Sequence, residues 1–397
     1  MKIIIHNYGG YPYSRQLAES LAKRKHSVHY IYSDTTQAIK RVAEHEEQTN
    51  LQVTPITLAK KFAKYSLFQR RAGEIEHGKK VADEIQRTQP EVVFSADTPL
   101  DAQKYILKAC EQRKTKFVFW MQDAIGLATR KILSQKMPIA GSVIGRYYEG
   151  IEQRMVKQSD MVIVISEDFL PLMKQWKIPE ERVRVIHNWA PLEELNIQPK
   201  QNPWSQKFKL DDKYCFLYAG ILGFKHSPEL FIQLAREFQP LDEVRVVVIA
   251  EGEAAEWLKE EKEKQQLDNL VLLPYQSAEE YAQVLGAGDV LMSILNPEAG
   301  AYSVPSKVLS YLCARRPLLL SIPKGNLAAR IVSENEVGLV CAPSEANQWL
   351  KNARCLYEDP DLRERMAENA RSYAEKNFEI EQITERFEEI MDSCWKN

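Results

Sequence analysis

Residues 2–32 have the sequence KIIIHNYGGYPYSRQLAESLAKRKHSVHYIY, and the order of its parts indicates the fold. An isoleucine-rich strand at Lys2–His6 is followed by a loop with two glycines and by a helical pattern over Ser14–Lys25, with apolar residues on one face. A second strand follows at Val28–Tyr32. A strand, a glycine loop, a helix and a second strand in this order form the opening βαβ unit of a doubly wound α/β sheet.

The glycines of this loop are Gly9 and Gly10. The loop lacks the G-x-G-x-x-G spacing, so it is only a weak indication of dinucleotide binding. Two interpretations stay open: the glycines let a ligand approach the backbone closely, or they only make the turn. We expect the loop to face a ligand.

Further strands continue the pattern up to residue 190. Continuous apolar runs such as residues 161–165 indicate strands that are covered on both faces, as in a parallel sheet. A stretch rich in Asn, Gln and Pro between His187 and Trp204 then breaks the pattern, and it is the candidate domain boundary. The expected strands of this first half are Glu91–Ser95, Lys116–Gln122, Met161–Ser166 and Val183–Ile186.

A second alternating series of strands and helices indicates a second Rossmann-like domain. We therefore expect one domain over residues 1–190 and another over residues 205–377. The helical tail at residues 378–397 has an apolar face and a glutamate-rich face, and it could pack back against the basic first domain. The strands of the second series are Cys215–Ala219, Val244–Ala250, Leu270–Leu273, Asp289–Leu295, Leu318–Ile322 and Gly338–Val340.

Length and charge agree with this division. The chain has 397 residues, which exceeds the size that one hydrophobic core usually serves. Its formal net charge is −2, and we expect no nucleic-acid partner. The charge is uneven, because residues 1–190 hold 30 Lys and Arg against 21 Asp and Glu, and the remainder holds 23 against 34. This asymmetry either points to an anionic surface that the first domain meets or reflects solvated surfaces that differ.

Metal, disulfide and membrane-spanning signals are weak. The six cysteines lie far apart without a Cys-x-x-Cys motif, which favours buried free thiols in a reducing cytoplasm. Of the histidines only His26 and His29 lie close together, so no metal site is expected. The short apolar run at Met1–His6 is interpreted as a strand and not as a signal peptide. We expect a cytoplasmic protein and leave open a peripheral position on the inner face of the membrane.

Two segments mix basic residues with apolar ones. They could rest on an anionic membrane surface. Alternatively, each is an amphipathic helix that packs its apolar side on the sheet. The first segment comprises Lys60, Lys61, Lys64, Arg70, Arg71, Lys79 and Lys80 with Leu58, Phe62, Leu67 and Phe68, and the second comprises Arg130, Lys131, Lys136 and Arg146 with Leu133, Met137, Ile139, Val143 and Ile144.

A loop of small residues after the strand at residues 289–295 leads into a helix at Val304-Pro305-Ser306-Lys307. Pro305 suits the first helical turn, where its missing N–H is no loss. The free backbone N–H groups and the positive end of the helix dipole form a seat for a phosphate. Ser306 would complete this seat, and Lys307 either adds charge to it or lies on the helix surface.

By its motifs the chain resembles the GT-B glycosyltransferases of family 4, a retaining group, and most closely the bacterial surface-polysaccharide transferases. Each motif is weak alone, but the series covers almost the whole chain in the right order. The resemblance implies two Rossmann-like doubly wound domains that face an interdomain cleft. It is carried by Gly9-Gly10, Ser166 after its apolar strand, His187-Asn188-Trp189, Tyr218-Ala219-Gly220 with Lys225, Glu251-Gly252-Glu253 and Val304-Pro305-Ser306-Lys307.

The resemblance also implies a set of residues for a nucleotide diphosphate sugar, the donor. Lys225 would reach the diphosphate, where a flexible cation suits the charge that develops on the leaving group; a solvated surface lysine is the alternative. Gly220 and Gly223 would let the backbone pass close to the phosphates, and Tyr275 and Gln276 would contact the base, unless Tyr275 fills the core. The other donor-binding residues expected are Ala301, Tyr302, Ser303, Val304, Ser306, Lys307 and Ser310.

On the acceptor side, family members often carry a His-Asp pair after the strand at residues 117–121, and here Gln122 replaces the histidine. Asp123 remains a candidate for contacting the acceptor or the sugar hydroxyls, with a helix N-cap as the alternative. Gly9, Gly10 and Gln122 are the acceptor-side residues expected, and Lys225 and Asp123 are the expected catalytic residues.

One departure from the family pattern concerns the donor site. Many members carry two glutamates eight positions apart, and alignment on Pro305-Ser306-Lys307 places these positions near Tyr302 and on Ser310. A serine makes one hydrogen bond to a ribose where a carboxylate could accept two stronger ones. The departure implies weaker donor binding, an unusual donor or a catalytically silent protein.

On this resemblance we expect a metal-independent retaining hexosyltransferase that needs no cofactor. It would move a sugar to a lipid-linked or saccharide acceptor in the assembly of cell-surface polysaccharide or glycolipid. Two rivals stay open: a non-catalytic GT-B subunit that binds a nucleotide sugar, which the missing glutamates favour, and a nucleotide-sugar epimerase.

Overall fold

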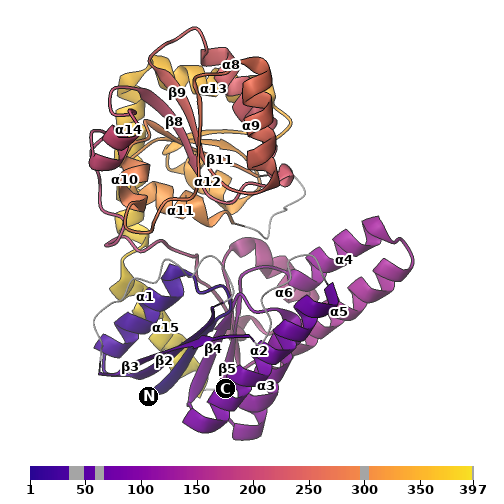
Figure 1. Ribbon diagram of the computed structural model, residues 1–397. Coiled ribbons are helices and arrows are strands. Elements are labelled where there is room, and N and C mark those ends of the chain that lie inside the picture. The colour runs from indigo at the N-terminus through magenta and orange to yellow at the C-terminus, as the bar shows by residue number, and fades with distance from the viewer. Residues whose placement is uncertain (35–48, 59–66, 296–303, 396–397) are drawn as a thin grey trace. The chain divides into compact units, whose positions relative to one another are not determined.

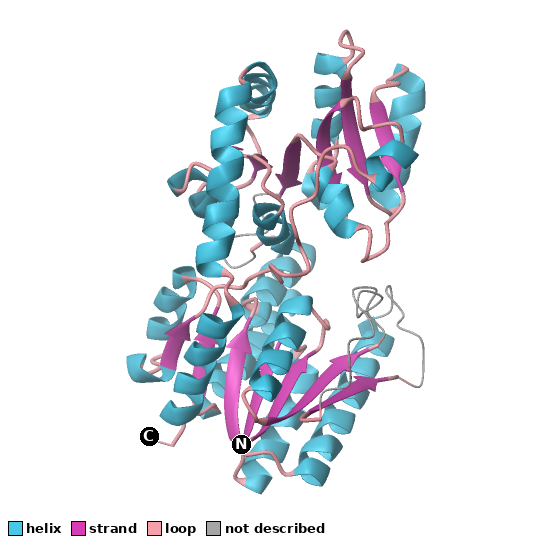
Figure 2. Cartoon of the chain, turned by 90° about the vertical axis from the view of Figure 1, so that its left-hand side faces the viewer, coloured by secondary structure: helices cyan, strands magenta, loops and turns pink. Residues whose placement is uncertain are grey.

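The computed structural model describes residues 1–34, 49–58, 67–295 and 304–395, and the chain divides into two compact units (Figure 1). The first unit comprises Met1–His187 with Ile380–Asn397, and the second comprises Asn188–Glu379. Each unit contains a parallel sheet with helices on both of its faces (Figure 2). The predicted α/β class with two Rossmann-like sheets is therefore confirmed.

The sheet of the first unit has the strand order β3-β2-β1-β4-β5-β6-β7. Its strands are β1 (Lys2–Asn7), β2 (Ser27–Ser33), β3 (Leu51–Ile56), β4 (Val92–Ala96), β5 (Lys116–Met121), β6 (Met161–Val164) and β7 (Val183–Val185). The helices are α1 (Pro12–Lys23), α2 (Leu67–Thr88), α3 (Leu100–Arg113), α4 (Ile125–Lys136), α5 (Ala140–Gln158), α6 (Leu170–Gln175) and α15 (Ile380–Ser393).

The sheet of the second unit has the strand order β10-β9-β8-β11-β12-β13. Its strands are β8 (Tyr214–Ala219), β9 (Val244–Ile249), β10 (Leu270–Leu273), β11 (Val290–Ile294), β12 (Leu318–Ser321) and β13 (Gly338–Cys341). The helices are α7 (Pro203–Lys207), α8 (Glu229–Phe238), α9 (Glu253–Gln265), α10 (Tyr281–Gly286), α11 (Ser306–Cys313), α12 (Leu327–Glu334), α13 (Ala346–Glu358) and α14 (Pro360–Asn377).

Both sheets reverse their winding direction at one point. In the first unit the chain moves outward from β1 to β2 and β3, and then returns to place β4 on the other side of β1. In the second unit β8 is flanked by β9 and β11 in the same way. At such a switch point the neighbouring loops diverge to opposite faces, which leaves room for a ligand at the carboxyl ends of the strands.

Most strands lie where the apolar runs predicted them, and the four residues of β6 are all buried, as expected for a strand covered on both faces. The strand β3 was not predicted from the sequence. This edge strand contains Pro55 and is largely exposed, so it lacks the apolar run that marks the central strands. A proline is tolerated there because an edge strand needs fewer ladder hydrogen bonds.

The helix α15 lies beside α1 in the first unit (Figure 1). Its buried Phe387 packs on Trp120 of β5, with the ring centroids 4.8 Å apart. On the outer face, Arg24 at the end of α1 donates to the carboxylates of Glu381 and Glu388, at 2.8 Å in each case. An apolar contact and an ion-pair network together fix the end of the chain to this unit.

Replacement of Arg24 by glutamine should loosen α15, because Glu381 and Glu388 would lose their shared cation. We expect faster limited proteolysis between α15 and the preceding helix, and a stability loss of about 1 kcal/mol, as for a partly exposed network. The control is Arg15→Gln on the same helix, since Arg15 pairs with Glu19 within α1 at 2.7 Å. Equal cleavage rates in the two variants would contradict a clamping role for Arg24.

Candidate functional site

In the second unit, the end of β8 and the start of α11 meet at the switch point. Gly220 follows β8 with a φ of +144°, and its N–H donates to the carbonyl of Ile249 at 3.0 Å. A methyl group on Gly220 would lie 3.1 Å from Cε of Lys307. The structure therefore brings Gly220 and Lys307 together, and it places the Lys307 side chain over the loop instead of on the outer surface of α11.

The ammonium group of Lys307 is held by Tyr218, the penultimate residue of β8. Nζ lies 3.7 Å from the centroid of the Tyr218 ring and donates to the Tyr218 hydroxyl. That hydroxyl donates onward to the carbonyl of Ile221 at 2.7 Å. Burial raises the pKa of Tyr218 well above its ordinary value, so the phenol stays neutral beside the cation. A cation–π contact and a hydrogen bond thus fix a positive charge at this loop.

The buried Tyr311 fixes the position of α11. Its hydroxyl accepts the N–H of Ala219 at 2.9 Å and donates to the carbonyl of the same residue at 3.2 Å. Because residues four apart share one face of a helix, Lys307 lies one turn before Tyr311 on the side that faces β8. The helix begins at Ser306, which is exposed, and Pro305 at the N-cap offers no side-chain cap. The first N–H groups of α11 are those that a phosphate would need.

The turn after Gly220 contains Gly223, whose N–H donates to Nδ1 of His226 at 2.9 Å. His226 was not among the site residues predicted from the sequence. Lys225 lies between them in a short 3₁₀ turn (Phe224–His226), and its side chain is outside the described part of the structure. The prediction that Lys225 reaches a diphosphate therefore stays a prediction.

The remaining donor-side residues differ in what the structure describes. Tyr275 follows β10 and donates its N–H to the carboxylate of Glu251 at 3.3 Å. The carboxamide of Gln276 accepts from the indole N–H of Trp204 at 2.9 Å and donates to the Pro274 carbonyl, so it holds its own loop. Val304 and Ser310 are partly buried at the start of α11 and one turn further on, whereas Ala301, Tyr302 and Ser303 lie outside the described residues.

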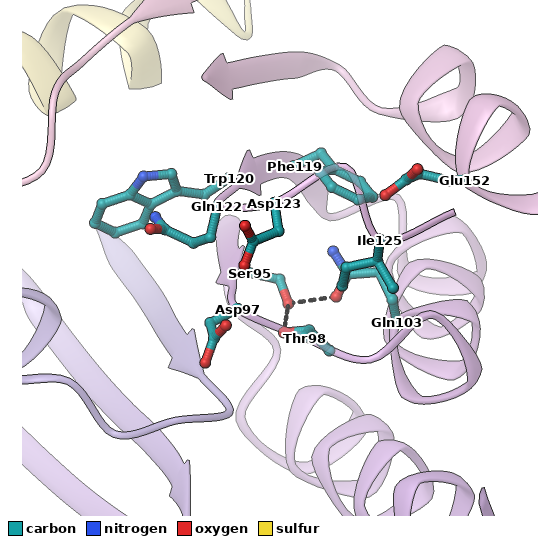
Figure 3. Close-up of a pocket in the computed structure, with 10 residues that line it drawn as sticks. All are labelled: Ser95, Asp97, Thr98, Gln103, Phe119, Trp120, Gln122, Asp123, Ile125 and Glu152. Carbon is teal, nitrogen blue, oxygen red and sulfur yellow. Dashed lines mark hydrogen bonds between the residues drawn. The ribbon is translucent and has the colours of Figure 1, made fainter. Parts of the chain in front are cut away.

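In the first unit, a pocket lies at the carboxyl ends of β4 and β5 (Figure 3). The predicted residues Gln122 and Asp123 line it, and so does Asp97, which directly follows β4. Ser95, Thr98 and Gln103 form a hydrogen-bonded group in its wall (Figure 3). The full lining is Ser95, Asp97, Thr98, Gln103, Phe119, Trp120, Gln122, Asp123, Ile125 and Glu152.

The two glycines after β1 have separate roles beside this pocket. A methyl group on Gly9 would lie 2.4 Å from Oδ2 of Asp97, so only a glycine lets that carboxyl approach, and the N–H of Gly9 donates to it. Gly10 has a φ of +64° and donates its N–H to the carbonyl of Asn7 at 3.1 Å, which closes the turn. The group that approaches Gly9 is thus a carboxyl of the same chain, and Gly10 makes the turn, whereas the expectation that this loop faces a ligand stays a prediction.

Two carboxyls of the pocket are held in a protonated state more readily than usual. Burial, followed by the charge of Asp123, raises the pKa of Asp97 to about 7. Burial likewise raises the pKa of Glu152 on α5 to about 8. Glu152 is fully buried, and it accepts the N–H of Gly126 at 2.9 Å in the first turn of α4. A carboxyl from α5 therefore caps α4, and the N-cap position of that helix is Ala124 and not Asp123.

Sequence reasoning missed Asp97 and Glu152, for different reasons. Asp97 could have been found, because it follows a predicted strand at the same sheet edge as Gly9 and Asp123. No sequence pattern marks Glu152, because its role depends on how α5 packs against α4. Among the residues that the structure describes, no group of three or more His, Cys, Asp or Glu side chains is arranged to hold a metal ion.

Two family models match the chain. The model described as "Glycosyltransferase Family 4" matches residues 9–194, and the model described as "Glycosyl transferases group 1" matches residues 200–373. Among curated proteins, the alpha-D-kanosaminyltransferase of Streptomyces kanamyceticus is 23% identical over 225 residues, which cover 55% of this chain and 56% of that protein. The putative glycosyltransferase YtcC of Bacillus subtilis (strain 168) is 23% identical over 52% of each chain. The chain thus spans about half the length of the curated relatives that it matches.

Solved structures share the fold over nearly their whole length. The Anabaena protein Alr3699/HepE, crystallised in complex with UDP, superposes with a TM-score of 0.73 at 15% identity and covers 99% of this chain and 100% of its own. WaaG, a glycosyltransferase involved in lipopolysaccharide biosynthesis, superposes with a TM-score of 0.69 at 15% identity, over 98% of this chain and 99% of its own.

The pKa shifts of the pocket predict a specific dependence of stability on pH. A carboxyl whose pKa is higher in the folded than in the unfolded state stabilises the protein at low pH, and this stabilisation is lost as the pH rises through the folded pKa. The Asp97→Asn/Glu152→Gln variant lacks this loss. Between about pH 5 and about pH 9, the free energy of unfolding of the unmodified protein should therefore fall by several kcal/mol relative to the variant, with most of the fall below about pH 8.

Urea unfolding at several pH values measures this difference. The exposed Asp83 of α2 provides the control, because Asp83→Asn should leave the difference from the unmodified protein constant over the same range. If the free energies of unfolding of the double variant and the unmodified protein also differ by a constant amount over this pH range, burial does not raise the pKa of the two carboxyls.

Proposed function

The chain belongs to the GT-B glycosyltransferases of family 4, and we propose that it transfers a sugar from a nucleoside diphosphate donor to an acceptor. The observation that carries this proposal is the position of Lys307, whose cation is fixed over Gly220 beside the first turn of α11. A fixed cation, a glycine backbone and the first turn of a helix are what a diphosphate needs, and they occur here at one sheet edge.

We assign the donor to the second unit. Alr3699/HepE was solved with UDP, and a uridine diphosphate is the first donor group to test here. Lys307, together with Lys225, would balance the charge that develops on the leaving diphosphate, which is the role that a divalent ion serves in other transferases. Retention would proceed as the acceptor oxygen bonds to the anomeric carbon on the same face from which the diphosphate leaves, while the leaving diphosphate accepts the proton of the acceptor hydroxyl.

We assign the acceptor to the pocket of the first unit. Asp123 is an exposed carboxylate at the pocket, and a carboxylate accepts hydrogen bonds from sugar hydroxyls. Asp97, with its pKa near 7, can both donate and accept at neutral pH. The acceptor would be a saccharide or a lipid-linked sugar in the assembly of cell-surface polysaccharide or glycolipid, and a lipid-linked acceptor would require work at the inner face of a membrane.

A second candidate is a catalytically silent subunit that binds the nucleotide sugar. Ser310 stands where many family members carry a glutamate, and its hydroxyl replaces a carboxylate with a weaker hydrogen-bonding group. An epimerase is the third candidate. Incubation with UDP-hexoses and saccharide acceptors separates the three, because the products are a glycoside with the donor's anomeric configuration, an unchanged donor or an inverted sugar.

Removal of the charge of Lys307 should weaken the binding of UDP. We expect Lys307→Ala to lower the affinity about tenfold to a hundredfold, as for the loss of one charge-assisted hydrogen bond. Titration calorimetry with UDP measures the affinity. Lys264→Ala is the matched control, because Lys264 is 73% exposed on α9 of the same unit. If the Lys307→Ala variant binds UDP as tightly as the unmodified protein, the diphosphate does not bind at this loop.

Lys225→Ala tests the second cation separately. If Lys225 stabilises the leaving group, this variant should lose sugar transfer while it still binds UDP, since the charge matters most in the transition state. Initial rates of sugar transfer, measured with the donor and acceptor that the incubation with UDP-hexoses identifies, test this expectation. Turnover equal to that of the unmodified protein would show that Lys225 has no catalytic role.

A further inference from the structure

The helical hairpin formed by α4 and α5 exposes an unusual number of apolar side chains. In the described part of the chain, thirteen large hydrophobic residues are exposed, and six of them lie within residues 132–147. Ile139 in the connection between the helices is 86% exposed, and Val143 in the first turn of α5 is 65% exposed. The six are Ile132, Met137, Ile139, Val143, Ile144 and Tyr147.

The hairpin does not need these side chains for its own packing, because its helices meet through glycines. A methyl group on Gly141 would lie 2.0 Å from the carbonyl oxygen of Leu133, and one on Gly145 would lie 2.4 Å from Cα of Arg130. Such distances mean that the two backbones touch. The bulky residues near the tip are therefore left to face outward, and the expectation that this segment packs its apolar side on the sheet is not met for them.

The base of the hairpin is fixed to the first unit, and its tip extends away from the sheet (Figure 1). The hydroxyl of Tyr148 on α5 donates to Asp101 of α3 at 3.1 Å. Within the hairpin, Glu152 of α5 accepts the N–H of Gly126 in the first turn of α4, so the two helices are joined at the base. A hairpin held at its base presents its tip as a preformed surface.

The tip of the hairpin, residues 131–147, carries positive charge only. Residues 124–148 contain four Arg and Lys residues and no Asp or Glu. Arg130 pairs with Glu149 beyond this stretch at 2.7 Å, whereas Lys131 and Arg146 are exposed beside the apolar residues. Exposed apolar side chains with basic side chains around them are the composition that binds the interface of an anionic bilayer.

We propose that the tip of the α4–α5 hairpin inserts into the headgroup region of an anionic lipid bilayer. The biological sense of this contact rests on the proposed function, since it would bring the chain to a lipid-linked acceptor. A second copy of the chain fits the surface less well, because a symmetric contact would set the same positive charges against each other. No helix among the described residues is long and apolar enough to cross a membrane, so the contact would be peripheral.

Co-sedimentation with vesicles tests the proposal. The full chain should bind vesicles of phosphatidylglycerol and phosphatidylcholine and bind pure phosphatidylcholine weakly. The Ile139→Asp/Val143→Asp variant should reduce binding at least about tenfold, because it places two carboxylates at the inserted surface. The control is Leu170→Asp/Ile197→Asp, which makes the same change of charge at residues that are 40% and 43% exposed elsewhere.

An equal loss in both variants, or no vesicle binding by the unmodified protein, would overturn the proposal. So would a concentration-dependent dimer that the tip variant abolishes without any vesicle binding, since the surface would then serve self-association. Sugar transfer to a soluble acceptor should be unchanged in the tip variant, so a failure of the membrane contact is distinct from a failure of the proposed function.

A second measurement detects insertion directly. The Ile139→Cys/Cys355→Ser variant can be labelled at the tip with an environment-sensitive dye, because Cys355 is the exposed cysteine and the other native ones are buried. The dye emission should shift to the blue on anionic vesicles. Emission that stays as it is in water, with vesicles in excess, would mean that the tip does not enter the bilayer.

Discussion

The two hydrogen bonds between the Tyr311 hydroxyl and the backbone of Ala219 determine the geometry of the candidate donor site. They fix a buried side chain of α11 against the last residue of β8. Because Lys307 lies four residues earlier on the same helix face, these bonds also set its ammonium group beside Tyr218 and over Gly220. The start of α11 and the glycine loop then form one surface. A larger residue at position 220 would meet Lys307, so the loop and the helix are matched to each other.

The first unit uses the same topological feature with the opposite charge. Its switch point between β1 and β4 brings Gly9 beside Asp97, and the neighbouring β5 adds Asp123. Where the second unit presents a cation, the first presents carboxyls, one of them with a pKa near 7. A cationic site suits a diphosphate, and a carboxyl-lined site suits sugar hydroxyls, so the chemistry of each unit favours one of the two substrates that a glycosyltransferase must hold.

Much of this arrangement follows from the sequence, because buried parallel strands leave continuous apolar runs and glycines mark the loops after β1 and β8. The edge strand β3 left no such run, since it is exposed and contains Pro55. The position of Lys307 could not be decided from the sequence, because it depends on the register between α11 and β8 that Tyr311 sets. Gly9 was recognised, but the group that approaches it is Asp97 of the same chain, which only the pairing of β1 with β4 reveals. The predicted residues Ala301, Tyr302 and Ser303 lie outside the described part of the structure and stay predictions.

The central claim is that a nucleoside diphosphate binds at the end of β8 and the start of α11. Amide hydrogen exchange, followed by mass spectrometry with and without UDP, tests it most directly because it reports on the backbone N–H groups themselves. We expect slower exchange in peptides that contain residues 217–226 and 304–310, and unchanged exchange around Gly9 and Asp97. Protection that is confined to the first unit, or absent from residues 304–310 at saturating UDP, would contradict it.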